Sequence, residues 1–95
     1  MTLRKTEKIP AGKLVRLEIE LDGTTVRHVF VRGDFFAHPE EAFEAAEAEL
    51  VGVPVAELPE RAKRAFARPG LSIIGASPED IAGLLERTIH EAQVS

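Results

Sequence analysis

The sequence contains no cysteine, tryptophan or tyrosine among its 95 residues. Without cysteine the chain cannot form a disulfide bond, a thiolate nucleophile, an iron–sulfur site or a cysteine-based zinc site. Five phenylalanines are its only large aromatic residues, so the core must be built mainly from Val, Leu, Ile and Ala. No apolar stretch resembles a signal peptide or reaches membrane-spanning length, which predicts a cytoplasmic chain with no membrane partner.

The length allows a single domain, residues 1–95, with one thin hydrophobic core. Its net charge of −4 is unevenly distributed, because residues 1–33 carry seven Lys/Arg against four Asp/Glu, whereas residues 34–95 carry five against twelve. This asymmetry predicts two electrostatic faces that orient a partner, although glutamates on the solvated sides of helices explain most of the acidic half. Because the basic residues do not cluster and the domain is acidic, no nucleic-acid partner is expected.

Hydrophobic residues at every second position predict a strand over residues 13–21 with one solvated face. The dipeptide that follows, Asp22-Gly23, predicts a hairpin turn into a return strand over residues 24–32. The alternation of that strand is irregular, and a β-bulge near residues 27–28 would bring Val26 back into line. Residues 3–8 are expected to pair as a further edge strand, so the sheet has two or three strands.

After Gly33 the hydrophobic period changes from 2 to 3.6, which predicts helices. Pro39 suits the first turn of the first helix, and Gly52 stands where a left-handed cap would end it. A shorter helix is predicted from residue 59 to residue 66. Residues 71–75 form an apolar segment that is either a loop or an edge strand.

The last helix is expected to begin with Ser77 as its N-cap and Asp80 completing a capping box. An apolar stripe follows at helical spacing from Ile81 to Ile89. The sum is an α+β domain, a two-layer sandwich in which an antiparallel two- or three-stranded meander is followed by about three helices on one face.

The sequence shows no self-contained active site, since it has no glycine-rich phosphate loop, nucleophile elbow or histidine pair at metal-ligand spacing. His38 and Glu41 are three residues apart at a helix start, but without a third ligand they are interpreted as a surface pair and not as a metal site. No catalytic residue and no metal site are therefore predicted.

Two segments nevertheless call for an explanation, and the first is a corner over residues 8–13. Lys8 and Lys13 flank a Pro/Gly turn that includes Gly12. Exposed backbone N–H groups with lysines nearby can hold a phosphate or a carboxylate. An ordinary strand-entry turn with solvated lysines is the alternative.

The second segment is the junction over residues 33–36, Gly-Asp-Phe-Phe. Gly33 permits a close or left-handed backbone, and the Asp34 side chain can hydrogen-bond to local N–H groups and hold the turn. Two adjacent phenylalanines do not easily enter one core from a loop, so either Phe35 or Phe36 is expected to face outward as an interface anchor. The alternative is that both are buried between the sheet and the helices.

Together these segments resemble a known family, the C-terminal accessory domain of lipoate–protein ligase, which in some organisms is a separate second subunit of a bipartite ligase. The resemblance rests on KIPAGKL at residues 8–14, an amphipathic hairpin, GDFF at residues 33–36, PEE at residues 39–41 and SPEDIA at residues 77–82. It spans about residues 7–90. One departure is Ala11, where the family pattern usually has a second glycine.

The resemblance implies a role in an ATP-dependent ligase. The assembled enzyme uses ATP, Mg²⁺ and lipoate to form lipoyl-adenylate, and then transfers the lipoyl group to a lysine of a lipoyl-domain protein or of the glycine-cleavage H protein. The catalytic lysine and nucleotide loops belong to the large catalytic subunit, so this chain is expected to have no cofactor of its own. The accessory domain is thought to support adenylation by closing over or ordering the active site. Its fold is similar to that of sulfur-acceptor and iron–sulfur scaffold proteins.

The resemblance also assigns a working surface to the chain. Residues close to the partner or the nucleotide are expected to be Lys8, Gly12, Lys13, Gly33, Asp34, Phe35 and Phe36. Lys13, before Lys8, is expected to face the nucleotide or the catalytic subunit. The alternative function is a non-enzymatic interaction module of the same fold with another partner. A sulfur-transfer or cluster-scaffold role is excluded because cysteine is absent.

Overall fold

Three antiparallel strands form the sheet of this protein, and the computed structural model describes residues 1–10 and 12–94. The strands are β1 (Thr2–Lys8), β2 (Leu14–Asp22) and β3 (Thr25–Gly33), in the order β1-β2-β3. The predicted edge strand and hairpin are confirmed, with each boundary within one residue of its predicted place. Ala11, the departure from the family pattern, lies outside the described residues.

The expected β-bulge is present at Arg27. The register pairs Glu20 with His28 and then Leu21 with Val26. Arg27 is therefore the extra residue, and it changes which face the following side chains occupy. As a result Val26 is 1% exposed and joins the core, whereas Phe30 stays on the solvent side of the sheet at 43% exposure.

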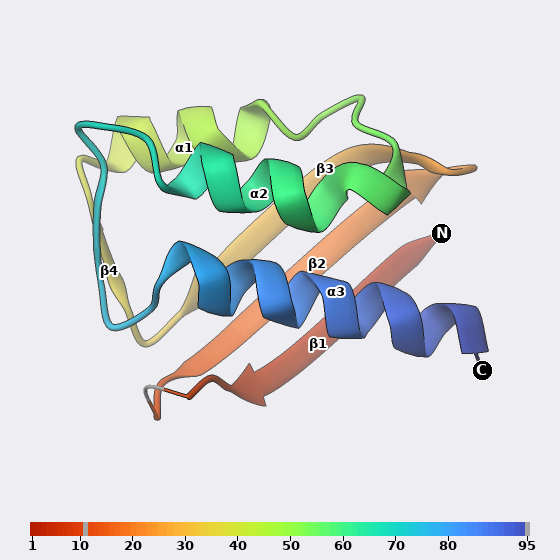
Figure 1. The fold of residues 1–95 in the computed structure, drawn as a ribbon, viewed down its shortest axis with the longest axis horizontal. Coiled ribbons are helices and arrows are strands. Elements are labelled where there is room, and N and C mark those ends of the chain that lie inside the picture. The colour runs from red at the N-terminus through yellow and green to blue at the C-terminus, as the bar shows by residue number, and fades with distance from the viewer. Residues whose placement is uncertain (11, 95) are drawn as a thin grey trace.

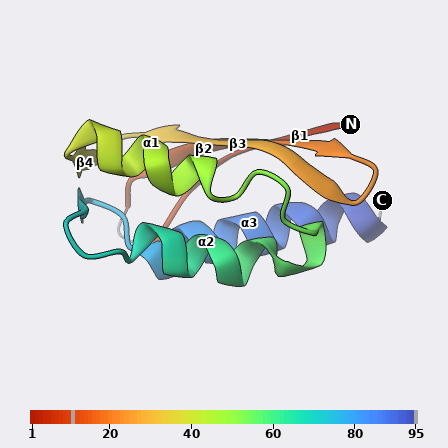
Figure 2. The ribbon, with the colours of Figure 1, turned by 90° about the horizontal axis from the view of Figure 1, so that it is seen from above.

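The helices are α1 (Glu40–Ala48), α2 (Leu58–Phe66) and α3 (Pro78–Val94), with a short 3₁₀ helix, η1 (Val55–Glu57), before α2. Figure 2 shows α2 and α3 in a layer on one side of the sheet, while α1 lies beside β3, close to the level of the sheet. The opposite face of the sheet carries no helix (Figures 1 and 2). The α+β fold is confirmed, with α2 and α3 on one face of the large sheet and α1 at the edge formed by β3.

The boundaries of α1 differ from the prediction at both ends. Pro39 is extended, with φ −74° and ψ 156°, and it precedes the helix as its N-cap residue instead of occupying the first turn. The helix ends at Ala48, four residues before Gly52. Gly52 does have a left-handed φ of +87°, but its N–H donates to the carbonyl of Val26 on β3 at 2.7 Å. The segment after the helix thus hydrogen-bonds to the edge of β3.

The predicted capping box of α3 is confirmed. The backbone N–H of Asp80 donates to Oγ of Ser77 at 3.0 Å, and the N–H of Ser77 donates to Oδ2 of Asp80 at 3.3 Å. These reciprocal bonds satisfy two donors that the first turn of a helix otherwise leaves without a partner. The helix start is thus fixed by its own sequence.

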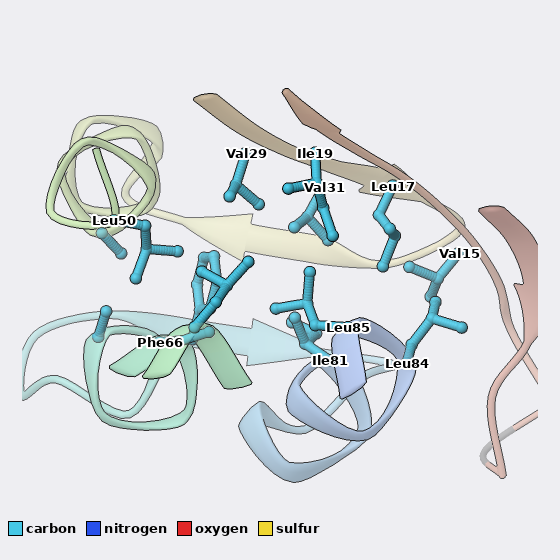
Figure 3. Close-up of a cluster of buried hydrophobic side chains, with 14 of the residues drawn as sticks. Val15, Leu17, Ile19, Val29, Val31, Leu50, Phe66, Ile81, Leu84 and Leu85 are labelled. Atoms are coloured by element: carbon cyan, nitrogen blue, oxygen red, sulfur yellow. The ribbon is translucent and has the colours of Figure 1, made fainter. Parts of the chain in front are cut away.

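The core lies between the inner face of the sheet and the layer of α2 and α3, as Figure 3 shows. The predicted apolar stripes supply it from both sides. Its largest fully buried side chains are Phe66, Ile19, Leu50, Leu58, Ile81, Leu84, Leu85, Val15, Val26 and Val31. Burying a side chain of this kind stabilises the fold by about 1.5–3 kcal/mol. The core therefore consists almost entirely of aliphatic residues, as the composition predicted.

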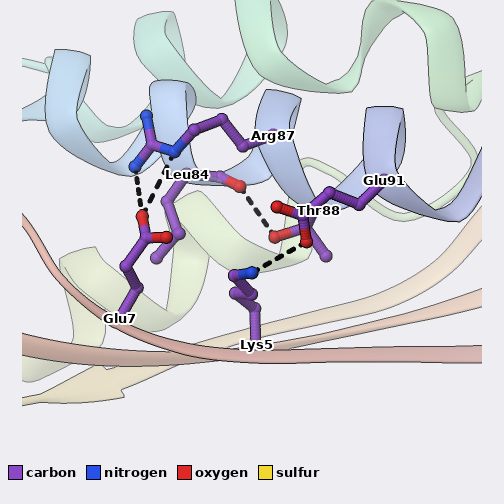
Figure 4. Close-up of polar contacts among 6 residues, drawn as sticks. All are labelled: Lys5, Glu7, Leu84, Arg87, Thr88 and Glu91. Atoms are coloured by element: carbon purple, nitrogen blue, oxygen red, sulfur yellow. Dashed lines mark hydrogen bonds and ion pairs between the residues drawn. The ribbon is translucent and has the colours of Figure 1, made fainter.

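Polar contacts hold α3 against β1, the outer strand (Figure 4). Nζ of Lys5 donates to Glu91 at 2.7 Å, and the guanidinium of Arg87 donates to Glu7 at 2.6 Å. The paired residues are 86 and 80 positions apart in the chain. They tie α3 to the first strand of the sheet at its solvent-exposed side.

A second, two-stranded sheet interrupts the expected direct passage from β3 to the first helix. Strand β4 (Phe36–His38) pairs antiparallel with β5 (Ser72–Ile74). Of the two alternatives for residues 71–75, the edge strand is therefore the one that forms. In Figures 1 and 2 β4 lies at one end of the molecule, and both chain termini lie at the other.

Candidate partner-binding surface

The corner between β1 and β2 is closed by its own backbone. Ile9 is 2% exposed, and its N–H donates to the carbonyl of Lys13 at 2.9 Å. Gly12, at φ +84°, donates its N–H to the carbonyl of Ile9 at 2.8 Å. These two amides are therefore used within the turn and cannot hold an anion. The side chains of Lys8 and Lys13 are the described groups of the corner that carry positive charge for an anion.

Lys8 and Lys13 are both exposed on this corner. Within residues 1–10 and 12–94, neither side chain takes part in an ion pair. Lys5, three residues before Lys8 on the same strand, is by contrast bonded to Glu91. The two lysines of the corner thus present positive charge that the fold itself does not use.

Gly33 brings the junction into direct contact with the corner. A Cβ atom at this position would lie 2.2 Å from the carbonyl oxygen of Leu14, a distance that no side chain tolerates. Its neighbour Asp34 donates its backbone N–H to the same carbonyl at 2.9 Å. Glycine is required here because the backbones of two segments nearly twenty residues apart meet at Leu14.

Asp34 holds the junction in a different way from the one predicted. Its backbone N–H makes the bond to Leu14, and its exposed side chain forms no hydrogen bond with other residues that the structure describes. The carboxylate is therefore available at the surface, on the same end of the molecule as the two lysines.

The two phenylalanines of the junction point to opposite sides. Phe35 is half-buried and packs on the core, with its ring centroid 5.8 Å from that of Phe43. Phe36 is 77% exposed. The expectation that one ring faces outward is confirmed, and the alternative in which both are buried is wrong. The pairing of β4 with β5 causes the split, since successive residues of a strand face opposite sides.

Phe36 has an apolar neighbour that sequence reasoning did not identify. Its partner in the register with β5 is Ile74, which is 67% exposed. The only sequence signal was an apolar segment over residues 71–75 of undecided structure. Two large apolar side chains thus lie opposite each other on the solvent side of the small sheet, at the end of the molecule that carries the corner and the junction.

The charge asymmetry of the sequence has a simple counterpart in the fold. The three-stranded sheet is formed by residues 1–33, which carry the basic excess, and the helices follow within residues 40–94, which carry the acidic excess.

Among the described residues, no three His, Asp or Glu side chains gather in a way that suits a metal ion. None of the described helices is long and apolar enough to cross a membrane.

Comparison with known proteins finds relatives of one kind. The chain is 31% identical over 80 residues to lipoate-protein ligase A subunit 2 of Thermoplasma acidophilum. The matched region covers 84% of this chain and 83% of the relative. A solved chain from an archaeal lipoylation system of the same organism, a bipartite lipoate protein ligase and its E2 lipoyl domain, matches the fold with a TM-score of 0.70. That match has 24% identity and covers 90% of this chain and 97% of the solved one. No protein-family model matches the chain.

Proposed function

This chain belongs to the family of lipoate–protein ligase A subunit 2, and from that membership we propose that it is the accessory subunit of a bipartite lipoate–protein ligase. In this proposal it supports the ATP-dependent activation of lipoate to lipoyl-adenylate by a separate catalytic subunit. The lipoyl group then passes to a lysine of a lipoyl-domain protein or of the glycine-cleavage H protein. The two chains work together in the cytoplasm.

The observation that best supports this role is the contact between the corner and the junction at Leu14. It gathers Lys8 and Lys13, which form no ion pair within the described part of the chain, and the exposed Phe36 at one end of the sheet. Formation of an adenylate concentrates negative charge on phosphate oxygens, and positive charge placed beside them stabilises the transition state. A domain that closes over the site also excludes water. Lys13 is the residue that we assign to this task, with Lys8 second.

ATP, Mg²⁺ and lipoate belong, in this proposal, to the catalytic subunit. The described residues of this chain offer no cluster of carboxylates and histidines to hold Mg²⁺. The chain contributes shape and charge around the site and supplies none of the groups that react.

Reconstitution tests the proposal directly. The chain is mixed with a candidate catalytic subunit, ATP, Mg²⁺ and lipoate, and lipoyl-adenylate is quantified by mass spectrometry. We expect the product only when both chains are present. In a parallel reaction preformed lipoyl-adenylate replaces ATP and lipoate, and transfer to an acceptor domain should then proceed without this chain.

The outcomes separate the proposal from its alternative. If the catalytic subunit makes as much lipoyl-adenylate alone as with this chain, the accessory role is wrong. If the chain fails to bind the catalytic subunit and co-purifies with an unrelated protein, the chain is an interaction module with another partner.

A further inference from the structure

The exposed pair, Phe36 and Ile74, is the most exposed set of large apolar side chains away from the chain ends. Their exposed fractions are 77% and 67%, compared with 51% for Val51 and 43% for Phe30. Single exposed apolar residues are common on protein surfaces, but an adjacent pair of this size marks an interaction site more often. The two residues are also direct partners across the strands, so their side chains lie on one face of the small sheet.

The fold holds this pair outward. The next register pair, Ala37 and Ile73, is half-buried and packs on the core. Because strand residues alternate between faces, burying Ala37 and Ile73 forces Phe36 and Ile74 into solvent. Gly75, directly after β5, has a φ of +99°, a backbone conformation that favours glycine, and it lies in contact with the junction at Asp34 and Phe35. The pair is therefore presented on a backbone fixed from both sides.

Lys8 and Lys13, which form no ion pair with the residues that the structure describes, lie at the same end of the molecule. The corner with Lys8 and Lys13 is joined to the junction by the bond from Asp34 to Leu14, and the junction leads directly into Phe36. A partner that covers the apolar pair thus also meets the two lysines and the carboxylate of Asp34 at its rim. Apolar anchors at the centre and charged groups around them are the usual arrangement of a protein interface.

We propose that Phe36 and Ile74 form a single apolar anchor that inserts into an apolar pocket of the catalytic subunit and so holds Lys8 and Lys13 beside the nucleotide phosphates bound there. This inference rests on the proposed function and specifies how the two chains hold together. A second copy of this chain fits the surface poorly. Two copies that met at this pair would each bring two lysines against one Asp34 carboxylate, and the excess positive charges would repel each other.

Affinity measurements with matched variants test the anchor. The catalytic subunit is titrated with wild-type chain, Phe36→Ala, Ile74→Ala and the double variant by isothermal titration calorimetry. Loss of a central aromatic anchor weakens binding by about tenfold or more, so Phe36→Ala should raise the Kd by at least that factor. The double variant should bind more weakly than either single variant. Thermal unfolding should remain near that of the wild type, because both side chains are largely exposed.

Phe30→Ala is the matched control for Phe36→Ala, since it removes the same side chain from the helix-free face of the large sheet. Val51→Ala is the control for Ile74→Ala, since it removes an exposed aliphatic side chain from the turn after α1. Both should bind like the wild type. Unchanged affinity for Phe36→Ala and Ile74→Ala would overturn the anchor while leaving the adenylation role intact.

Sedimentation of the chain alone adds a second check. If it is a dimer that Phe36→Ala dissociates, while binding to the catalytic subunit persists, the pair serves self-association and the anchor assignment is wrong. If the wild-type chain neither binds the catalytic subunit nor supports adenylation, the proposed function fails, and the anchor fails with it.

Discussion

Glu47 of α1 accepts a hydrogen bond from the backbone N–H of Val31 on β3, at 2.8 Å. The glutamate is 8% exposed, and its carboxylate also pairs with Arg32 at 2.9 Å. Val31 lies on the strand edge that faces away from β2, where an unpaired N–H would otherwise be buried beneath the helix. A buried charge in a small aliphatic core is thus explained by the need to close a sheet edge.

Replacing this carboxylate should destabilise the domain more than replacing its ionic partner. Glu47→Ala leaves the N–H of Val31 buried without an acceptor, which costs about 1–3 kcal/mol. Glu47→Gln keeps an acceptor oxygen and should cost less. Arg32→Ala should cost the least, because the arginine is half-exposed and exposed ion pairs contribute about 1 kcal/mol or less. Urea unfolding of the three variants gives the order, and an Arg32→Ala effect as large as that of Glu47→Ala contradicts this account.

Substitution of Gly33 by alanine should destabilise the domain much more than the same substitution of Gly12. Gly33→Ala places a Cβ against the backbone of Leu14 and should destabilise the domain by about 3 kcal/mol, since neither backbone can yield cheaply. Gly12 has a positive φ but open space around its Cα, so Gly12→Ala should cost only about 1 kcal/mol. The midpoints of chemical unfolding compare them. Equal effects would show that the close approach at Leu14 is not the reason for Gly33.

The free energy of unfolding at alkaline pH should depend on the ion pair between Lys5 and Glu91. The hydrogen bond from Lys5 to the Glu91 carboxylate raises the pKa of the lysine above its ordinary value of 10.5. The pair therefore contributes its full stabilisation when the pH is below the pKa of Lys5 in the unfolded chain. This contribution is lost as the pH rises through the higher pKa of Lys5 in the folded protein. The wild type should therefore lose stability above pH 10.5, and Glu91→Gln should lose less over the same range. Parallel pH profiles of the two proteins would contradict the assignment.

Adenylation should depend on Lys13 without any change in folding. Lys13→Ala removes an exposed charge that forms no ion pair with the described residues, so the unfolding midpoint should be unchanged. In the reconstituted pair, the rate of lipoyl-adenylate formation should fall by about tenfold or more if the lysine stabilises developing charge on phosphate. Lys8→Ala should have a smaller effect. Lys63→Ala, on an exposed position of α2, is the matched control and should have none. An unchanged rate for Lys13→Ala removes this residue from the proposed mechanism.

Local patterns were sufficient to predict the large sheet and the last helix. The bulge at Arg27 followed from the mismatch of Val26 with the alternation of its strand, and the capping box followed from Ser77 and Asp80. Each of these features is encoded by residues within a few positions of one another. The prediction therefore needed no knowledge of tertiary contacts.

The pairing of the small sheet could not be predicted from the sequence. For that reason Ile74 was not identified as the exposed partner of Phe36. Strands of three residues are too short to show a period, and the partners Phe36 and Ile74 are far apart in sequence. Which phenylalanine faces outward depends on that long-range pairing, so the sequence alone left Phe35 and Phe36 equivalent. The role of Glu47 depends on the fold as well, because only the fold shows that its carboxylate accepts the hydrogen bond from the N–H of Val31.

The positions of the two chain ends constrain how this subunit can be joined to another protein. Both lie at the end of the molecule away from β4 (Figure 1), and the longest dimension of the Cα trace is 33 Å. A covalent tether from either end to a catalytic subunit bound at the exposed pair must therefore run the length of the domain. At about 3.3–3.6 Å per extended residue, that requires a linker of about ten residues or more. Fluorophores and affinity tags at the same ends should leave the working surface free.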